Sequence, residues 1–227
     1  MIKIMDEHRT TEEYWDRRAE DWNASSARRS YLTEWYEAWK GQLKPPYLDI
    51  GFGSGKFLER LAKNGNLDIY GIDISAKLVR MAREKLRPFL KEETSKRIRV
   101  LDMSDLVRIY PEAYFNTLIF SGTLQQVPFT EAKQIMEAIA RISQTGAIMY
   151  FSTRSITSPP KEGIIVPGQN ERTYRLPEGA VKTYFSIGDI QELAKDLWQI
   201  LNLDIKGQTE KISGEPIENL EGVLIKS

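Results

Sequence analysis

Short apolar runs alternate with amphipathic segments through the middle of the chain. The β-rich runs cover residues 47–51, 67–73, 97–102, 115–121 and 147–152. The first helical pattern between them covers residues 57–63 and ends at Asn64-Gly65, and the second runs from Ser75 toward Pro88. The third is capped by Thr130 and carries Ile135, Ile139 and Ile142 on one face. Strands that alternate with helices form parallel sheets covered by helices, so the pattern predicts a doubly wound α/β fold.

The pattern changes after the fifth predicted strand. Residues 154–180 contain four prolines and three glycines and show no sustained period, which predicts a variable lid or a disordered loop. Ser186 then begins a predicted helix whose inner face carries Ile190, Leu193, Ala194 and Leu197. Residues 199–206 and 222–226 are predicted as two final strands.

The first 45 residues set aromatic side chains among charged ones. Tyr31, Trp35 and Trp39 fall four residues apart and therefore share one helical face. We expect residues 1–45 to form a helical cap that packs on the sheet, covers a cleft, or does both. We therefore predict that residues 1–227 form a single domain. It consists of this cap, a core at 46–153, the lid at 154–180, and the rest of the sheet at 181–227.

Composition limits the chemistry that the 227 residues can perform. The chain has no cysteine and one histidine, which excludes disulfides, a thiol nucleophile and thiolate metal sites, and argues against a Ser-His-Asp triad. Its 32 basic residues balance 32 acidic ones, which weighs against a nucleic-acid partner. The N-terminus is charged and no apolar run approaches the ~20 residues of a membrane span. We therefore predict a cytoplasmic protein without membrane or metal, with chemistry from backbone, carboxylates, hydroxyls or a cofactor.

A glycine turn between a predicted strand and helix is the strongest motif. It reads Leu48-Asp49-Ile50-Gly51-Phe52-Gly53-Ser54-Gly55-Lys56. Phe57 after Gly55-Lys56 breaks the phosphate-binding P-loop pattern, and Lys56 stands where a dinucleotide fingerprint needs its third glycine. A carboxylate at Asp49 repels a pyrophosphate and attracts a cation. The turn therefore favours a cationic cofactor.

These residues resemble the first motif of the class I S-adenosylmethionine-dependent methyltransferases. The resemblance implies a Rossmann-like, seven-stranded, mostly parallel sheet with one antiparallel strand near the C-terminus, and S-adenosylmethionine as the cofactor. It implies that Gly51, Gly53 and Gly55 approach the cofactor, that Asp49 binds its amino group and Asp73 its ribose, and that Ile74 also lies at the cofactor. It further implies that Asp102 and Met103 bind the adenine, that Ser121 lies beside the methyl group, and that Tyr14, Trp15 and Arg18 lie at the methionine end.

The resemblance predicts methylation of a small molecule and names no catalytic residue. Many relatives carry histidines where this chain has Gln125 and Gln126, which removes a possible general base. The residues expected near the acceptor are Gln125, Arg172, Arg175 and Tyr184. Cationic residues that face a cleft suit an acceptor with a carboxylate, whereas a solvated basic loop is the alternative.

Two other functions stay open from the sequence. A catalytically silent partner or sensor would keep the cofactor site without turnover, and the missing histidines fit this alternative. An NAD-binding oxidoreductase is disfavoured by Asp49 and Lys56. The sequence predicts a monomer or a homodimer.

Overall fold

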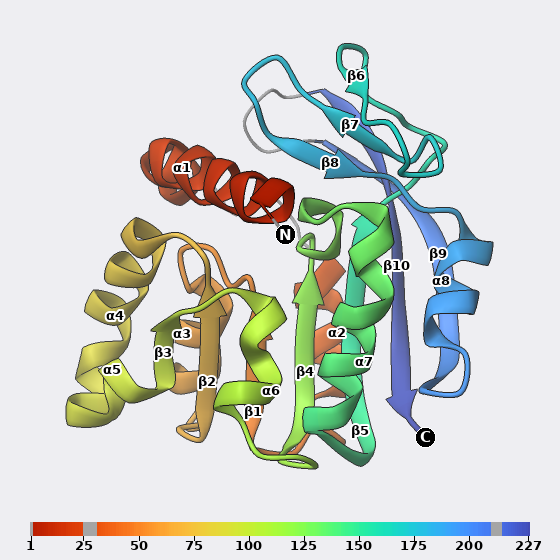
Figure 1. Ribbon diagram of the computed structural model, residues 1–227. Coiled ribbons are helices and arrows are strands. Elements are labelled where there is room, and N and C mark those ends of the chain that lie inside the picture. Colours follow the sequence, from red (N-terminus) through yellow and green to blue (C-terminus); the bar gives the residue numbers. More distant parts are fainter. Residues whose placement is uncertain (1, 25–30, 210–214) are drawn as a thin grey trace.

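A central seven-stranded sheet forms the body of the protein (Figure 1). The computed structural model describes residues 2–24, 31–209 and 215–227. The strand order is β3-β2-β1-β4-β5-β10-β9, and only β10 runs against its neighbours β5 and β9. The strands are β1 (Tyr47–Ile50), β2 (Ile69–Asp73), β3 (Ile98–Val100), β4 (Phe115–Ser121), β5 (Ser143–Arg154), β9 (Trp198–Thr209) and β10 (Pro216–Lys226). The predicted mostly parallel sheet with one antiparallel strand is confirmed.

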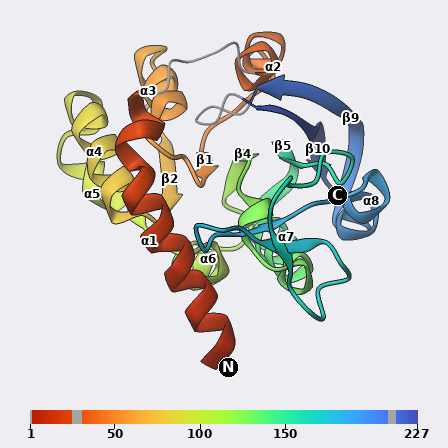
Figure 2. The same ribbon diagram turned by 90° about the horizontal axis from the view of Figure 1, so that it is seen from above.

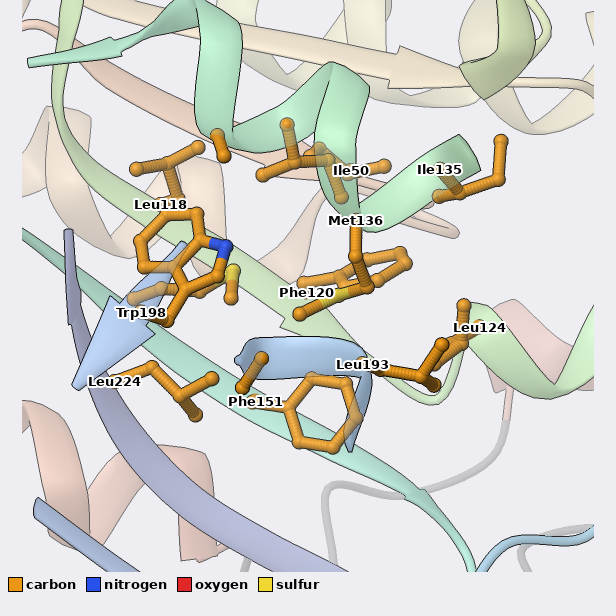
Figure 3. Close-up of a cluster of buried hydrophobic side chains, with 14 of the residues drawn as sticks. Ile50, Leu118, Phe120, Leu124, Ile135, Met136, Phe151, Leu193, Trp198 and Leu224 are labelled. Carbon is orange, nitrogen blue, oxygen red and sulfur yellow. The ribbon is translucent and has the colours of Figure 1, made fainter. Parts of the chain in front are cut away.

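Helices cover both faces of this sheet (Figure 2). One face carries α2 (Tyr31–Trp39), α3 (Lys56–Lys63) and α4 (Ala76–Leu90), with α5 (Thr94–Arg97) beside α4. The other carries α6 (Leu106–Ile109), α7 (Ala132–Ile142) and α8 (Ile187–Ala194). On this second face Ile135 and Met136 of α7 pack with Phe120 and Phe151 of the sheet, next to Trp198 (Figure 3).

The predicted N-terminal cap consists of two helices with different positions. Helix α1 (Ile2–Ala24) lies across the carboxyl ends of the parallel strands, whereas α2 packs on a sheet face (Figures 1 and 2). Trp35 of α2 is buried, with its ring centroid 5.2 Å from that of Tyr150. The side chain of Tyr31 lies outside the described part of the chain. Among the described residues, no helix combines the length and apolar character needed to cross a membrane.

The segment at 154–180 has more structure than its prolines predict. Strands β6 (Ile164–Ile165) and β7 (Thr173–Arg175) pair antiparallel, and β8 (Val181–Thr183) pairs with β7, in a small separate sheet. The Thr173 and Thr183 hydroxyls lie 2.9 Å apart, and that of Thr183 donates to the Val127 carbonyl at 2.5 Å. These long-range bonds hold the segment in place, so the predicted irregular loop is wrong in this part.

Several predicted boundaries also change. Thr130 does not cap α7, because it lies in the 3₁₀ turn η4 (Phe129–Glu131) and Glu131 is the cap residue. Strands β9 and β10 are much longer than predicted, because β10 pairs along its length with both β5 and β9. The other 3₁₀ turns are η1 (Lys91–Glu93), η2 (Met103–Asp105) and η3 (Leu124–Gln126). The caps predicted at Ser75 and Ser186 are confirmed by side-chain bonds to Leu78 and Asp189 amides.

Candidate functional site

A cavity of about 590 Å³ opens at the carboxyl ends of the parallel strands. This volume falls within the ~300–1,000 Å³ typical of ligand pockets. The wall has two parts. The first contains the glycine turn and the carboxyl ends of β2, β3 and β4. The second contains the carboxyl-terminal half of β5 and the amino-terminal half of β10. Helix α1 contributes Thr11, Trp15 and Trp22 to the wall.

The glycine turn needs glycine for two separate reasons. Gly51 and Gly53 have φ angles of 72° and 60°, in the left-handed region that side chains with a Cβ disfavour. A Cβ on Gly51 would lie 2.2 Å from the Thr123 hydroxyl, and one on Gly53 would lie 2.6 Å from Nε1 of Trp22. Because Gly51 and Gly53 have no Cβ, the side chains of Thr123 and of Trp22 in α1 can lie close to the backbone of the turn. Gly55, which precedes α3, does not line the cavity, and its missing Cβ makes room for Ala82 of α4.

Asp73 at the end of β2 is held in a fixed orientation. One carboxylate oxygen accepts the Gly53 amide at 2.8 Å, and the other accepts the Ser75 amide at 2.9 Å. Burial raises the pKa of Asp73 to about 6, although these backbone bonds lower it. The Ile74 amide also hydrogen-bonds to this carboxylate, which keeps some acceptor capacity beyond these backbone bonds. Asp73 can therefore accept a hydroxyl group of a ligand in the cavity.

Asp49 lies on β1 just before the glycine turn. Its side chain is buried and does not line the cavity. Burial, and secondarily the negative charge of Asp73, raise the pKa of Asp49 to about 8. A cation bound at the turn would favour the ionised carboxylate. The electrostatics of this position thus suit a positively charged ligand group.

Four further residues predicted at the cofactor also line the cavity. They are Ile74, Asp102, Met103 and Ser121. One oxygen of Asp102 accepts the Ser104 amide at 2.8 Å and so caps η2. The Ser121 hydroxyl lies 2.9 Å from that of Ser152 on the neighbouring strand β5.

The comparisons with known proteins agree with this architecture. A family model described as "Methyltransferase domain" matches residues 48–146, which include the glycine turn, Asp73 and Asp102. Residues 48–146 form a methyltransferase domain. The predicted family and enzyme class are thus confirmed at the level of this domain. A search of curated protein sequences finds no match.

Solved structures show the same fold at low sequence identity. The Burkholderia thailandensis 1,6-didemethyltoxoflavin-N1-methyltransferase aligns with a TM-score of 0.71 and 14% identity over 99% of this chain and 90% of that one. The Synechocystis magnesium protoporphyrin IX methyltransferase gives 0.66 and 16% over 97% of each chain. A Methanosarcina mazei S-adenosylmethionine-dependent methyltransferase gives 0.63 and 23% over 79% of this chain and 91% of that one.

Of the three α1 residues expected at the methionine end of the cofactor, Trp15 lines the cavity, whereas Tyr14 and Arg18 do not. Trp22 of the same helix also lines it. Tyr14 donates to Glu178 at 3.5 Å, and Arg18 lies 3.8 Å from the same carboxylate. Tyr14 and Arg18 therefore connect α1 to the segment that precedes β8.

The residues predicted near the acceptor divide in the same way. Gln125 lines the methyltransferase cavity, whereas Arg172, Arg175 and Tyr184 do not. Arg172 lies 3.6 Å from Asp189 of α8, and Arg175 donates to the Gly179 carbonyl at 3.5 Å. Tyr184 is buried, with its ring 5.5 Å from that of Tyr174.

The sequence prediction missed the second part of the cavity wall. This part comes from alternate residues of β5 and β10 and from the end of β9, and its side chains include those of six residues. The residues are Tyr150, Ser152, Arg154, Gln208, Asn219 and Glu221. Because the last strand was predicted to begin at residue 222, Glu221 fell in a loop. Polar residues that alternate with Phe151 and Leu220 in otherwise apolar strands are the signal that could have found them.

Proposed function

We propose that this protein transfers a methyl group from S-adenosylmethionine to a small molecule bound in the same cavity. The observation that carries the proposal is the continuous wall from the glycine turn to β10. The cofactor supplies an activated methyl group when bound. Asp73 would hold its ribose and Asp102 its adenine, with Gly51, Gly53, Ile74, Met103 and Ser121 around them. Asp49 would attract its ammonium group electrostatically from behind the cavity wall, and Gly55 lies behind the turn.

The donor set fits this cofactor in charge and in hydrogen-bonding capacity. Asp73 retains acceptor capacity for a ribose hydroxyl, and the backbone of Gly51 and Gly53 allows close approach. The raised pKa of Asp49, about 8, fits a carboxylate that ionises fully when an ammonium group binds beside it. A phosphorylated dinucleotide would instead bring negative charge to two buried carboxylates.

The shape of the wall supports a small acceptor. Besides the sheet and the glycine turn, α1 contributes Thr11, Trp15 and Trp22 to the wall and β8 contributes Lys182. Several elements thus surround a volume of about 590 Å³, which suits a small ligand. The formal net charge of the chain is zero, which supports a small molecule over nucleic acid. The Burkholderia relative, which was solved with 1,6-didemethyltoxoflavin and S-adenosylhomocysteine, also supports such an acceptor.

Calorimetric titration with S-adenosylhomocysteine and with NAD tests the cofactor. We expect S-adenosylhomocysteine to bind and NAD not to bind. Asp73→Asn should weaken S-adenosylhomocysteine binding at least about tenfold, since hydrogen bonds to charged groups contribute ~1.5–3 kcal/mol. Asp68→Asn is the control at the opposite end of the same strand, because Asp68 pairs with Arg97 away from the cavity. NAD binding without S-adenosylhomocysteine binding would overturn the proposal.

Turnover separates an enzyme from a silent binding partner or sensor. Incubation with methyl-labelled S-adenosylmethionine and a metabolite extract should transfer label to an extractable small molecule. Binding of S-adenosylhomocysteine with label transferred to no small molecule would favour the silent partner. The predicted monomer or homodimer is checked by light scattering of the same preparation.

A further inference from the structure

A row of polar side chains crosses the sheet from the predicted methyl-group end of the cavity. Ser121 of β4 is in register with Ser152 of β5, and Ser152 is in register with Glu221 of β10. Residues in register on neighbouring strands point to the same face, and each strand adds about 4.8 Å. Glu221 therefore lies about two strand spacings from Ser121, and all three residues line the cavity.

Glu221 is held in the wall by its neighbours. Its side chain is 6% exposed. One carboxylate oxygen accepts the Tyr150 hydroxyl at 2.9 Å, and the other accepts the Gln208 amide nitrogen at 3.4 Å. Each oxygen keeps further acceptor capacity. Glu221 is thus oriented toward a ligand without being saturated by the protein.

The charged groups around Glu221 tune its ionisation near neutral pH. Burial raises the pKa of Glu221 to about 7. The Tyr150 hydrogen bond and Lys206 of β9 lower the pKa, and Glu34 of α2 raises it. A general base works best when its pKa lies near the working pH.

Primary amides of Gln125, Gln126 and Asn219 line the same cavity. Gln125 is 7% exposed and Asn219 is 8% exposed. The side-chain carbonyl oxygens of Gln125, Gln126 and Asn219 are buried and accept no hydrogen bond from the described residues. An unsatisfied buried acceptor costs ~1–3 kcal/mol. A ligand that offers several N–H or O–H groups would remove this cost.

The charges of this wall do not favour an ionic ligand. Apart from Asp73 and Asp102 at the cofactor end, the charged residues that line the cavity are Glu34 and Glu221, with two negative charges, and Arg154 and Lys182, with two positive ones. We propose, on the basis of the proposed function, that Glu221 is the proton acceptor for methylation of an uncharged acceptor that offers N–H or O–H groups. Tyr150 is its positioning residue.

The proton balance of this step is simple. The acceptor nitrogen or oxygen forms a bond to the methyl carbon as the carbon–sulfur bond breaks, and sulfur keeps that electron pair. The acceptor then has one proton more than its neutral product. Glu221 takes this proton and later releases it to solvent.

Binding of defined probes to the protein saturated with S-adenosylhomocysteine tests the proposal. Uracil is uncharged and has two N–H groups, 1,3-dimethyluracil has none, and benzoate is anionic. We expect uracil to bind at least about tenfold more tightly than the other two. Its affinity should increase as pH rises through about 7, because the ionised Glu221 accepts the N–H group.

Three variants make the test specific to Glu221. Glu221→Gln should remove the pH dependence of uracil binding. Tyr150→Phe should keep the dependence and move its midpoint to higher pH, because the lost hydroxyl lowers the pKa of Glu221. Glu218→Gln is the control, because Glu218 lies on the opposite face of β10 and accepts from Thr157.

The outcomes distinguish this proposal from the proposed function. Equal affinity for the three probes, no uracil binding at millimolar concentration, or an unchanged pH profile in Glu221→Gln would overturn the role of Glu221. S-adenosylhomocysteine binding would leave the proposed function intact in each case. Wild-type protein that fails to bind S-adenosylhomocysteine would overturn the proposed function itself.

Discussion

Gly53 shows how one missing side chain shapes the site. Gly53→Ala would place a Cβ against Trp22 and strain a backbone at φ 60°. We expect stability to fall by ~1–2 kcal/mol from the strain, and S-adenosylhomocysteine affinity to fall about tenfold as Trp22 moves. Thermal unfolding and calorimetric titration measure the two effects.

Gly65 provides the matched control for this prediction. It also has positive φ, at 84°, but nothing lies within 4 Å of the position of its Cβ. Gly65→Ala should therefore carry a similar backbone strain and leave S-adenosylhomocysteine affinity unchanged. Equal loss of affinity in both variants would show that strain alone, rather than contact with Trp22, explains the result.

Asp49 should make the cofactor-free protein less stable as pH rises. Its pKa is about 8 in the folded chain against an ordinary value of 3.8, so between these values the folded state holds a proton that the unfolded state releases. The stability that this group contributes is thus complete below pH 3.8 and is lost as pH rises to about 8. Asp49→Asn should reduce this slope and raise the free energy of unfolding at pH 8 by ~1–3 kcal/mol.

The same variant should lose cofactor affinity, because a neutral amide attracts an ammonium group less than a carboxylate does. Denaturant titrations between pH 5 and pH 9 and calorimetry with S-adenosylhomocysteine measure both quantities. Asp68→Asn, at a partly exposed ion pair, is the comparison variant. A less stable Asp49→Asn protein at pH 8 would contradict the prediction.

Individual residues were predictable where one local motif fixes them. Asp73 follows a strand that follows the glycine turn, so short-range spacing places it at the cavity. Glu221 offers no such motif, because its position depends on pairing with residues about 70 positions earlier, at Tyr150 and Ser152. Arg172 and Arg175 were expected at the cleft from charge alone, and charge does not specify which way a side chain points.

Helix α1 is attached to the sheet domain through the beginning of α4. Asp16 accepts the Ser75 hydroxyl, and it accepts the Lys77 amide at 3.1 Å, where a negative charge is favourable. Asp16→Ala should lower S-adenosylhomocysteine affinity about 2- to 30-fold, the equivalent of a lost helix cap of ~0.5–2 kcal/mol, because Trp15 and Trp22 would lose their anchor.

Glu20 provides the control on the same helix. It pairs with Lys77 at 2.8 Å, but its side chain is 75% exposed, and exposed ion pairs contribute little. Glu20→Ala should therefore leave the affinity unchanged. Calorimetry compares the two variants, and equal affinities for Asp16→Ala and wild type would show that the Asp16 contacts do not hold α1 in place.

Whole elements were predictable when their pattern was local. The five parallel strands and the helices between them follow from period and caps, with errors at the ends. Strands β6 to β8 were not predictable, because they are short, interrupted by proline and glycine, and stabilised by the Thr183 bond to Val127 of another segment. The full length of β10 was hidden because Asn219 and Glu221 interrupt its apolar pattern.

At the scale of the whole molecule, stability should decrease from the middle of the sheet toward the cavity cover. Strands β1 and β4 lie between other strands and are largely buried, so their amides should exchange slowest with solvent. Residues 11–24 of α1 should exchange much faster without ligand and slow down with S-adenosylhomocysteine. Hydrogen-exchange mass spectrometry measures this, and α1 protection equal to that of β4 in the ligand-free protein would contradict it.

The position of β10 has a consequence for synthesis on the ribosome. β9 is translated before β10, yet β10 occupies the place between β5 and β9. A nascent chain that has completed β9 therefore exposes an unpaired edge of β5, and such edges invite pairing with other chains. Insertion of β10 closes that edge and delivers Glu221 and Asn219 to the cavity in the same event. The same late strand thus covers the exposed edge of β5 and completes the part of the cavity wall that contains Glu221 and Asn219.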